Sequence, residues 1–342
     1  MQTAKFLKKY DRLVIEPDGV ITSDCHFITC AMLSVYEMCN SKDYFGKTVL
    51  DYTSVYNNQK QITDLFLSSG KLPVVLSELG VDYPIDIAYI LLCAILGIGE
   101  RRDFSNIYNY FRYIDLHTPD IFDHCATLLG RVLPDKDCKR GGEVWLTLKR
   151  CYYEWLYGDE LYEMYTEEPF AGKGKPPVIL QDSLCQPIIS IRDTLSALLT
   201  AGKKISLCTL RTRPEVEVSF RRFKLDNIFS HENTVTVDDI TEAGHKPNIN
   251  SPLDPDPYAF ARGAVGTSFS ETAYEAGEYD ELFSRTLIVS SSPTSLFASQ
   301  ALGAGFAAVI RDPLDKSLKD MFRQFEADYV LDSFLDLVPH HK

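Results

Sequence analysis

The stretch Leu13-Val-Ile-Glu-Pro-Asp-Gly-Val-Ile-Thr-Ser23 decides how the rest of this 342-residue chain is interpreted. It begins as a short apolar run and ends in a tight acidic turn that contains glycine. This pattern is typical of a buried parallel strand that delivers a loop at its carboxyl end. In open α/β sheets, ligands bind at that edge, where the order of the strands reverses. The stretch therefore predicts a ligand-binding site at Glu16, Asp18 and Gly19.

From Pro187 onward, short apolar runs alternate with amphipathic stretches. The apolar runs predict strands at residues 204–208, 286–289, 306–310 and 329–331. The amphipathic stretches predict helices at 191–201, 215–225 and 294–302. Strands that alternate with helices of this length predict a parallel sheet with right-handed crossovers, and hence an α/β fold.

The long segment between the first strand and this region shows no strand pattern. It carries Leu, Tyr and Phe at helical spacing, and its longest apolar run, 87–98, is too short to span a bilayer and predicts a buried helix. We interpret residues 24–177 as an all-helical domain inserted into a core made of residues 1–23 and 178–342. The Gly-Lys-Gly-Lys-Pro-Pro segment, 172–177, mixes flexible and stiff residues and is predicted to be the return hinge.

Four sequence motifs resemble those of the haloacid dehalogenase (HAD) superfamily, and they occur in the family's order along the chain. The family's first motif is an apolar strand followed by Asp-x-Asp-Gly-Thr/Val, and here residues 16–20 read Glu-Pro-Asp-Gly-Val. Residues 187–209 resemble the helix and second motif of phosphoglycolate-phosphatase-like members. Residues 223–229 resemble the sequence that follows the second motif in those proteins. Lys246-Pro247, with Asp-Pro-Asp-Pro-Tyr at 254–258, resembles the third motif, although an insertion at 248–253 leaves the register of Lys246 open.

The resemblance implies a Rossmann-like parallel-sheet core with a large helical cap, and it implies roles for individual residues. In the family the first acid attacks phosphorus, the second is the general acid and base, and a lysine neutralises the phosphate. These catalytic roles fall on Glu16, Asp18 and Lys246. Phosphate contacts at the strand ends fall on Gly19, Thr209 and Leu210.

The fourth motif departs most from the family pattern of Gly-Asp-Ser, two residues and a further Asp. The chain reads Ser290-Ser-Ser-Pro-Thr-Ser295, so Ser291 and Ser295 replace both acids. These hydroxyls at a helix start, Ser291 and Ser292 above all, offer either an anion site or plain helix capping. In the family, Mg²⁺ is held by the nucleophile carboxylate, the carbonyl of the second Asp and a late acid, because it needs hard oxygen ligands.

Two changes in the sequence are therefore expected to weaken both Mg²⁺ binding and the phosphatase reaction. The late acids are gone, and the extra methylene of Glu16 displaces its oxygen by about an ångström, which can cost about a hundredfold in rate. We predict lost or strongly weakened Mg²⁺-dependent phosphatase activity, with Mg²⁺ as cofactor only in an active site held by Glu16 and Asp18. The fold can still serve in regulation or in binding a small phosphorylated molecule.

Two alternatives stay open. An active phosphomonoester hydrolase could use a rearranged acidic site that recruits Asp182, Asp238 or Asp239. A protein partner could instead bind through the cap, and an exposed apolar patch on the cap would favour that hypothesis.

The net charge and the cysteine content limit the classes of protein to which this chain can belong. The net charge is −13 and no basic stripe is visible, which argues against nucleic acid or an anionic membrane as partner. Nine cysteines without a Cys-x-x-Cys pair indicate free thiols in a reducing compartment. The first ten residues lack the apolar core of a signal peptide, so we expect a cytoplasmic protein.

Overall fold

The computed structural model describes residues 3–67, 76, 81, 83–98, 121–134, 137–166, 168, 172–245, 256–310 and 316–338. The chain divides into two compact units. One, the core, takes Met1–Asp24 and most of the chain from Asp182 to Lys342, and the other, the cap, takes Cys25–Gln181. The sequence predicts an inserted domain at 24–177. In the structure the chain passes from the cap back to the core after Gln181, a few residues beyond the Gly-Lys-Gly-Lys-Pro-Pro segment.

The core is built on a six-stranded, all-parallel sheet in the order β3-β2-β1-β4-β5-β6. The strands are β1 (Arg12–Ile15), β2 (Lys204–Cys208), β3 (Thr234–Val235), β4 (Thr286–Ser290), β5 (Gly305–Val309) and β6 (Tyr329–Leu331). β1 lies in the middle, with Ile15 opposite Leu207 of β2 and Val289 of β4. The loops after β1, β2 and β4 therefore leave the sheet side by side, at the point where strand order reverses.

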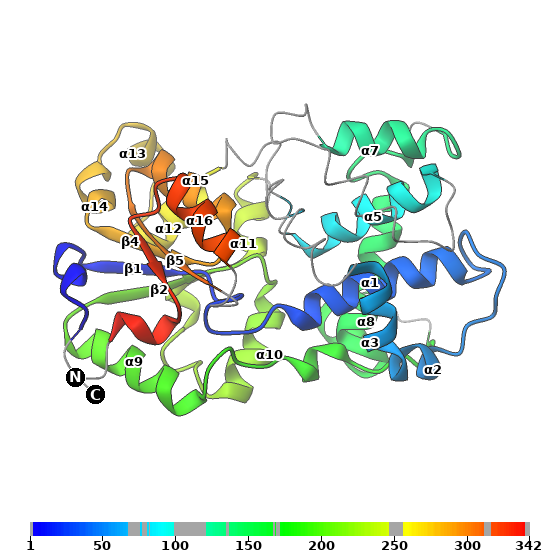
Figure 1. The fold of residues 1–342 in the computed structure, drawn as a ribbon, viewed down its shortest axis with the longest axis horizontal. Helices are drawn as coiled ribbons and strands as arrows, with labels where there is room; N and C mark the ends of the chain where they lie inside the picture. Colours follow the sequence, from blue (N-terminus) through cyan, green and yellow to red (C-terminus); the bar gives the residue numbers. More distant parts are fainter. Residues whose placement is uncertain are drawn as a thin grey trace. The chain divides into compact units, whose positions relative to one another are not determined.

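Helices cover both faces of this sheet (Figure 1). They are α9 (Ile188–Thr200), α10 (Arg213–Phe223), α11 (Val237–Glu242), α12 (Tyr258–Val265), α13 (Glu271–Glu275), α14 (Asp280–Ser284), α15 (Pro293–Leu302) and α16 (Lys316–Gln324), with short 3₁₀ turns η1 (Lys5–Lys9), η4 (His231–Asn233) and η5 (Phe334–Leu337). Alternation along β1 explains the two layers, because successive side chains point to opposite faces. Leu13 and Ile15 pack with α9 and α10, whereas Val14 packs with α12 and α15.

Helix ends depart from expectation where capping chemistry sets them. The helix expected at 215–225 is α10, which starts at Arg213 because Thr212 and Glu215 form a capping box. The helix expected at 191–201 is α9, which starts at Ile188 directly after Pro187. The strands at 204–208 and 329–331 are observed with the expected bounds.

The described part of the cap is helical. Its elements are α1 (Cys25–Asn40), α2 (Tyr52–Asn57), α3 (Gln59–Leu67), α5 (Pro84–Ile98), α7 (Ile121–Leu129), α8 (Glu143–Thr166) and the 3₁₀ turn η3 (Val178–Gln181). α1 packs against α3, α5 and α8. α8 is interrupted at Gly158, whose φ of 62° and ψ of 179° are not helical. Among the described residues, no helix has both the length and the apolar character that crossing a membrane requires.

Candidate functional site

The candidate site lies on the three neighbouring loops at the carboxyl ends of β1, β2 and β4. The β1 loop turns sharply at Gly19, which has a φ of 76° and donates its N–H to the Thr22 carbonyl at 2.7 Å. A positive φ of this kind favours glycine because it has no Cβ. The turn leaves both Glu16 and Asp18 partly buried at the sheet edge.

The Glu16 carboxylate is bound by hydroxyl groups at the start of α15. Its Oε2 accepts a hydrogen bond from the Ser290 hydroxyl and another, at 2.8 Å, from the Ser295 hydroxyl. The Ser290 oxygen also accepts the Ser292 N–H at 2.9 Å, which holds it in place. Because a helix N-terminus carries partial positive charge, this position stabilises a carboxylate. Glu16 is thus a built-in anion at the N-terminus of α15.

The other serines of this loop are also engaged within the protein. The Ser291 hydroxyl donates to the backbone carbonyl of Asp18 at 2.9 Å. The Ser292 side chain caps α15 by accepting from the Ser295 N–H. The Asp18 carbonyl is the atom expected to bind a metal, so the serine that replaces a late acid donates a hydrogen bond to that atom.

Asp18 forms an ion pair with Arg211, from the β2 loop. The Nη2 atom of Arg211 lies 2.6 Å from Asp18, and its Nη1 atom lies 2.7 Å from Asp182. Further hydrogen bonds run from Arg211 to Thr22 and Ser219, so all five guanidinium N–H groups have acceptors within reach. Burial disfavours the charged form, but Asp18 and Asp182 outweigh it and raise the pKa of Arg211.

Thr209 and Leu210, which the resemblance predicts to contact phosphate, follow β2 and directly precede Arg211 in the same loop. The Thr209 hydroxyl accepts the Arg211 backbone N–H at 3.1 Å and lies 3.4 Å from the Asp18 carboxylate. Leu210 is half-buried in the same loop. Thr209 therefore supports the Arg211 loop in this structure.

The residues present do not fit the family's magnesium ion. Mg²⁺ requires a near-octahedral shell of oxygen ligands, usually with more than one carboxylate nearby. Here the Glu16 carboxylate accepts two hydroxyl hydrogens, and the Asp18 carbonyl accepts a third from Ser291. The carboxylate of Asp18 is engaged by a buried guanidinium that it shares with Asp182, and positions 291 and 295 offer only hydroxyls.

Among the described residues, the other acids predicted for the site have partners different from Glu16. Lys246 lies outside the described residues. Asp182 faces Arg211, as described above. Asp239 pairs with Arg213 and with Arg262, and Asp238 accepts the Arg213 backbone N–H at 2.7 Å. The carboxylates proposed for a rearranged acidic site are therefore bound to arginine groups.

Arg211 was not predicted from the sequence, and Ser290 was considered only as part of the serine cluster at 290–295. Arg211 stands two positions after Thr209, in the loop at the carboxyl end of a strand that was predicted to be parallel to the first one. That placement was the available signal, because parallel neighbours deliver their loops to one edge. Ser290 ends β4, directly before the serine pair that was considered.

Comparisons with known proteins show similarity at the level of structure. No family model matches the chain, and no curated protein sequence matches it. The X-ray structure of a Northeast Structural Genomics Consortium target aligns with a TM-score of 0.66 and 19% identity, over 96% of this chain and 97% of that one. A predicted phosphoglycolate phosphatase from Haemophilus somnus 129PT aligns over 96% and 97% of the two chains, with 13% identity and a TM-score of 0.46.

A HAD family hydrolase from Deinococcus radiodurans R1, with bound phosphate and sodium, also aligns with a TM-score of 0.46 and 14% identity, over 96% of this chain and 93% of that one. Identities this low speak to the fold alone. Together with the all-parallel sheet and the helical insertion after β1, the structural similarity confirms the fold that the motifs indicated. The chain has a parallel α/β core with an inserted helical cap, the architecture that the resemblance to the haloacid dehalogenase superfamily implies.

Proposed function

We propose that this protein is a catalytically silent member of the HAD fold class, which acts by binding a partner rather than by hydrolysing a phosphomonoester. The observation that carries the proposal is the hydroxyl network of the β4 loop. Ser290 and Ser295 donate to the Glu16 carboxylate, and Ser291 donates to the Asp18 carbonyl.

Each step of the family's chemistry meets an obstacle in this arrangement. A carboxylate that accepts two hydroxyl hydrogen bonds on one oxygen is a poorer nucleophile toward phosphorus, since those bonds stabilise its charge. A general acid at Asp18 would have to gain a proton and give up its ion pair with Arg211. Arg211 would then keep Asp182 as its ionised partner, but the charge-assisted hydrogen bonds between Arg211 and Asp18 would be weakened.

Phosphate binding at this site faces the same competition. The hydroxyls of Thr209, Ser291 and Ser292 already have partners in the protein. An incoming phosphate would also meet the Glu16 carboxylate, a like charge, at the N-terminus of α15. We therefore place the binding role on the cap.

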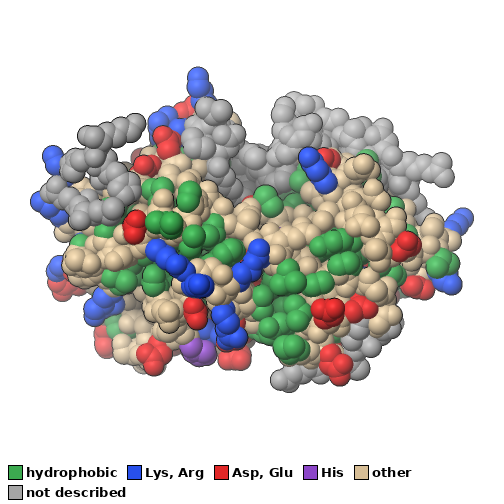
Figure 2. Space-filling model, turned by 90° about the horizontal axis from the view of Figure 1, so that it is seen from below, with side chains coloured by type: hydrophobic (Ala, Val, Ile, Leu, Met, Phe, Trp, Pro, Cys, Tyr) green, Lys and Arg blue, Asp and Glu red, His purple; other side chains and the backbone are tan. Residues whose placement is uncertain are grey.

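The surface of the cap supports a binding role. An uncharged groove of about 490 Å³ is lined by residues of α1, α2 and α3, among them Tyr36, Val55 and Ile62. Large apolar side chains are exposed on cap helices, with Leu65 at 47% and Met164 at 64% of their full exposure. Figure 2 shows one face of the molecule, on which hydrophobic side chains gather into surface patches. Exposed apolar patches are features of interaction sites.

The decisive experiment compares the protein with a variant in which the family's acids are restored. Hydrolysis of p-nitrophenyl phosphate and binding of Mn²⁺, followed by electron paramagnetic resonance, are measured for the unaltered chain, for Glu16→Ala, and for Glu16→Asp with Ser291→Asp and Ser295→Asp. The matched control carries Glu16→Asp with Ser291→Asn and Ser295→Asn, which has the same side-chain shapes without the added charge.

We expect the unaltered chain to turn over no faster than Glu16→Ala, and we expect saturable Mn²⁺ binding in the Asp-restored variant but not in its Asn control. Mg²⁺-dependent turnover that disappears in Glu16→Ala would refute the proposal. It would show that Glu16 still works as a nucleophile in spite of the hydroxyl network.

A further inference from the structure

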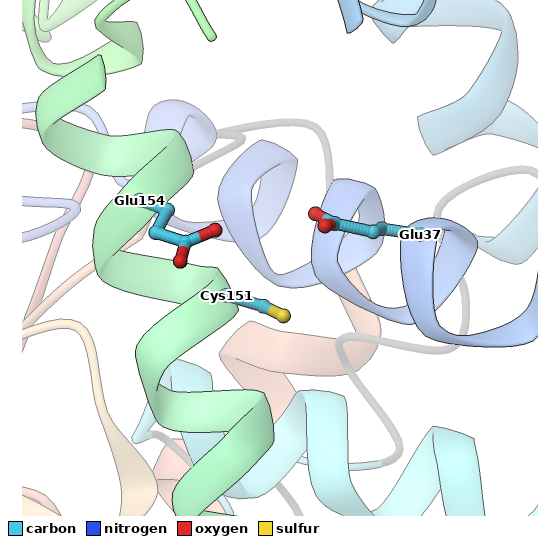
Figure 3. Close-up of side chains that lie close together, drawn as sticks. All are labelled: Glu37, Cys151 and Glu154. Atoms are coloured by element: carbon cyan, nitrogen blue, oxygen red, sulfur yellow. The ribbon is translucent and has the colours of Figure 1, made fainter. Parts of the chain in front are cut away.

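A buried cluster of charged side chains lies in the cap, away from the loops described above. Glu37 on α1 and Cys151 and Glu154 on α8 point toward one another, and their oxygen and sulfur atoms lie within 4.8 Å of each other (Figure 3). All three side chains are buried. The cation of this cluster is supplied by the chain itself, because the Lys175 Nζ atom lies 2.6 Å from Glu37 and 2.6 Å from Glu154.

A second lysine completes the charge balance. The Lys173 Nζ atom lies 3.2 Å from Glu37 and 3.0 Å from Glu154, and it also donates to the Tyr44 hydroxyl at 3.1 Å. Two ammonium groups thus face two carboxylates, and the half-exposed Arg150 adds a third cation, with its Nε atom 3.2 Å from Glu154. The set Glu37, Cys151 and Glu154 therefore does not need a metal ion, because the lysines already neutralise it.

Both lysines come from one short segment, Gly172–Pro177, which we call the strap. Its backbone is bound as firmly as its side chains. The carboxylate of Asp159 accepts the N–H of Gly174 at 2.6 Å and that of Lys175 at 2.8 Å, and the Asp159 N–H donates to the Lys175 carbonyl at 2.9 Å.

Helix α8 is shaped to receive the strap. It breaks at Gly158, where a Cβ atom would lie 2.5 Å from the Pro177 nitrogen and 2.7 Å from the Lys175 carbonyl oxygen. Contacts that short do not occur for real side chains, so only glycine lets the strap approach this closely. The break in α8 and the docking of the strap are one feature.

Aromatic rings close the cluster around Lys175. Its Nζ atom lies 5.1 Å from the ring centre of Trp155 and 5.2 Å from that of Tyr52. The Trp155 indole N–H donates to Glu37 at 3.0 Å, so the tryptophan contacts both signs of charge. Such faces attract a cation most strongly where water is excluded.

We propose that the strap is a latch, which fastens the exit of the cap to its entry helix α1 and to α8 through the pairing of Lys173 and Lys175 with Glu37 and Glu154. The argument rests on burial. If the strap moved away, Glu37 would lose both of its lysines and Glu154 would keep only the half-exposed Arg150, and a partial release would leave buried charge unpaired. Release is therefore all-or-none, and it frees the chain that leads back to the core at Asp182.

Protonation equilibria agree with a latch that is closed at neutral pH. Burial alone would raise the pKa of Glu154, but Lys175 and Lys173 outweigh it and lower the pKa. Burial alone would lower the pKa of Lys173, but Glu37 and Glu154 raise it. Each sign of charge holds the other in its ionised form.

Trypsin reports directly on the latch. In the strap it cuts only the Lys173–Gly174 bond, because Pro176 follows Lys175. We would follow cleavage of that bond by mass spectrometry in the intact chain and in Lys175→Met, Glu154→Gln and the double variant, with the exposed Lys60→Met as control. We expect each single variant to be cut more than about tenfold faster than the unaltered chain, because each leaves a buried charge unpaired. The double variant keeps the Lys173–Glu37 pair and should regain much of the protection.

Amide hydrogen exchange in the unaltered chain keeps the test independent of how well the variants fold. The N–H groups of Gly174 and Lys175 should exchange slowly, since both donate to Asp159. The proposal is overturned if these two amides exchange as fast as exposed peptide, or if Lys175→Met and Glu154→Gln are cut no faster than Lys60→Met. Equal losses that simply add in the double variant would also overturn it, because the charges would then act separately.

Discussion

Replacing Arg211 by methionine tests whether its buried ion pairs anchor the loops of the candidate site. Arg211 is only 2% exposed and Asp182 only 1% exposed, so the substitution strands a buried carboxylate. Breaking a buried ion pair by removing one partner costs about 3 to 5 kcal/mol of unfolding free energy. Asp18 keeps 21% of its side-chain exposure and can recover water, so the loss comes mainly from Asp182. For a domain of this size, the midpoint of thermal unfolding should fall by roughly 6 to 20 °C.

The matched control is Arg192→Met in the same domain. Arg192 donates only to the carbonyls of Phe223 and Lys224, so its loss should cost about 1 kcal/mol. Thermal and urea unfolding at pH 7 measure both variants, and Arg211→Met combined with Asp182→Asn should regain part of the loss. If Arg211→Met is no less stable than Arg192→Met, the buried pair of Arg211 with Asp182 does not anchor the loops.

Other substitutions test local features. Burial raises the pKa of Glu215 to about 7, against the opposing effect of its hydrogen bonds to Thr212, so its contribution to stability is full below its unfolded pKa and is lost as the pH rises through 7. That loss is about 3 kcal/mol, and urea unfolding at pH 5 and pH 8 should show a smaller difference for Glu215→Gln than for the unaltered chain. Asp239 behaves oppositely: its hydrogen bonds to Thr236 and its pairing with arginines overcome burial and lower its pKa, so stability is lost as the pH falls. Asp239→Asn should therefore flatten acid unfolding below pH 4, and an unchanged profile would contradict this. Gly158→Ala should lower the thermal midpoint of the cap by several degrees, and an unchanged midpoint would show that the strap can shift to make room.

The strands of the core could be predicted because they are buried on both faces and leave continuous apolar runs. Lys204–Cys208, with four buried residues, carries this signal and is observed as predicted, and the half-buried edge strand Tyr329–Leu331 is also observed as predicted. β3 gives no such signal, since it has only two residues, Thr234 and Val235. A strand that short is defined by its neighbour and not by its own pattern.

The candidate site could be located but not understood from the sequence. The prediction of a parallel sheet placed Glu16, Asp18 and the serine loop at one edge of that sheet, and the structure brings them together there. Whether the serines would receive a ligand or donate to the protein depends on hydroxyl directions, which no local pattern encodes. In the same way, glycine and proline suggested that the strap was a hinge, whereas the lysines between them bind it to Glu37 and Glu154.

The position of the cap in the chain also determines when the core can form during synthesis. β1 is made first, but its partner strands β2 and β4 come only after the whole cap, and Asp18 waits 193 positions for Arg211. At about 5 to 20 residues per second, that interval lasts roughly 10 to 40 s on the ribosome. The cap is continuous in sequence from Cys25 to Gln181, so it can fold completely in that time. The nascent chain thus carries an apolar strand without its sheet for tens of seconds, tethered to a finished helical domain, and this is the stage at which a chaperone would be most useful.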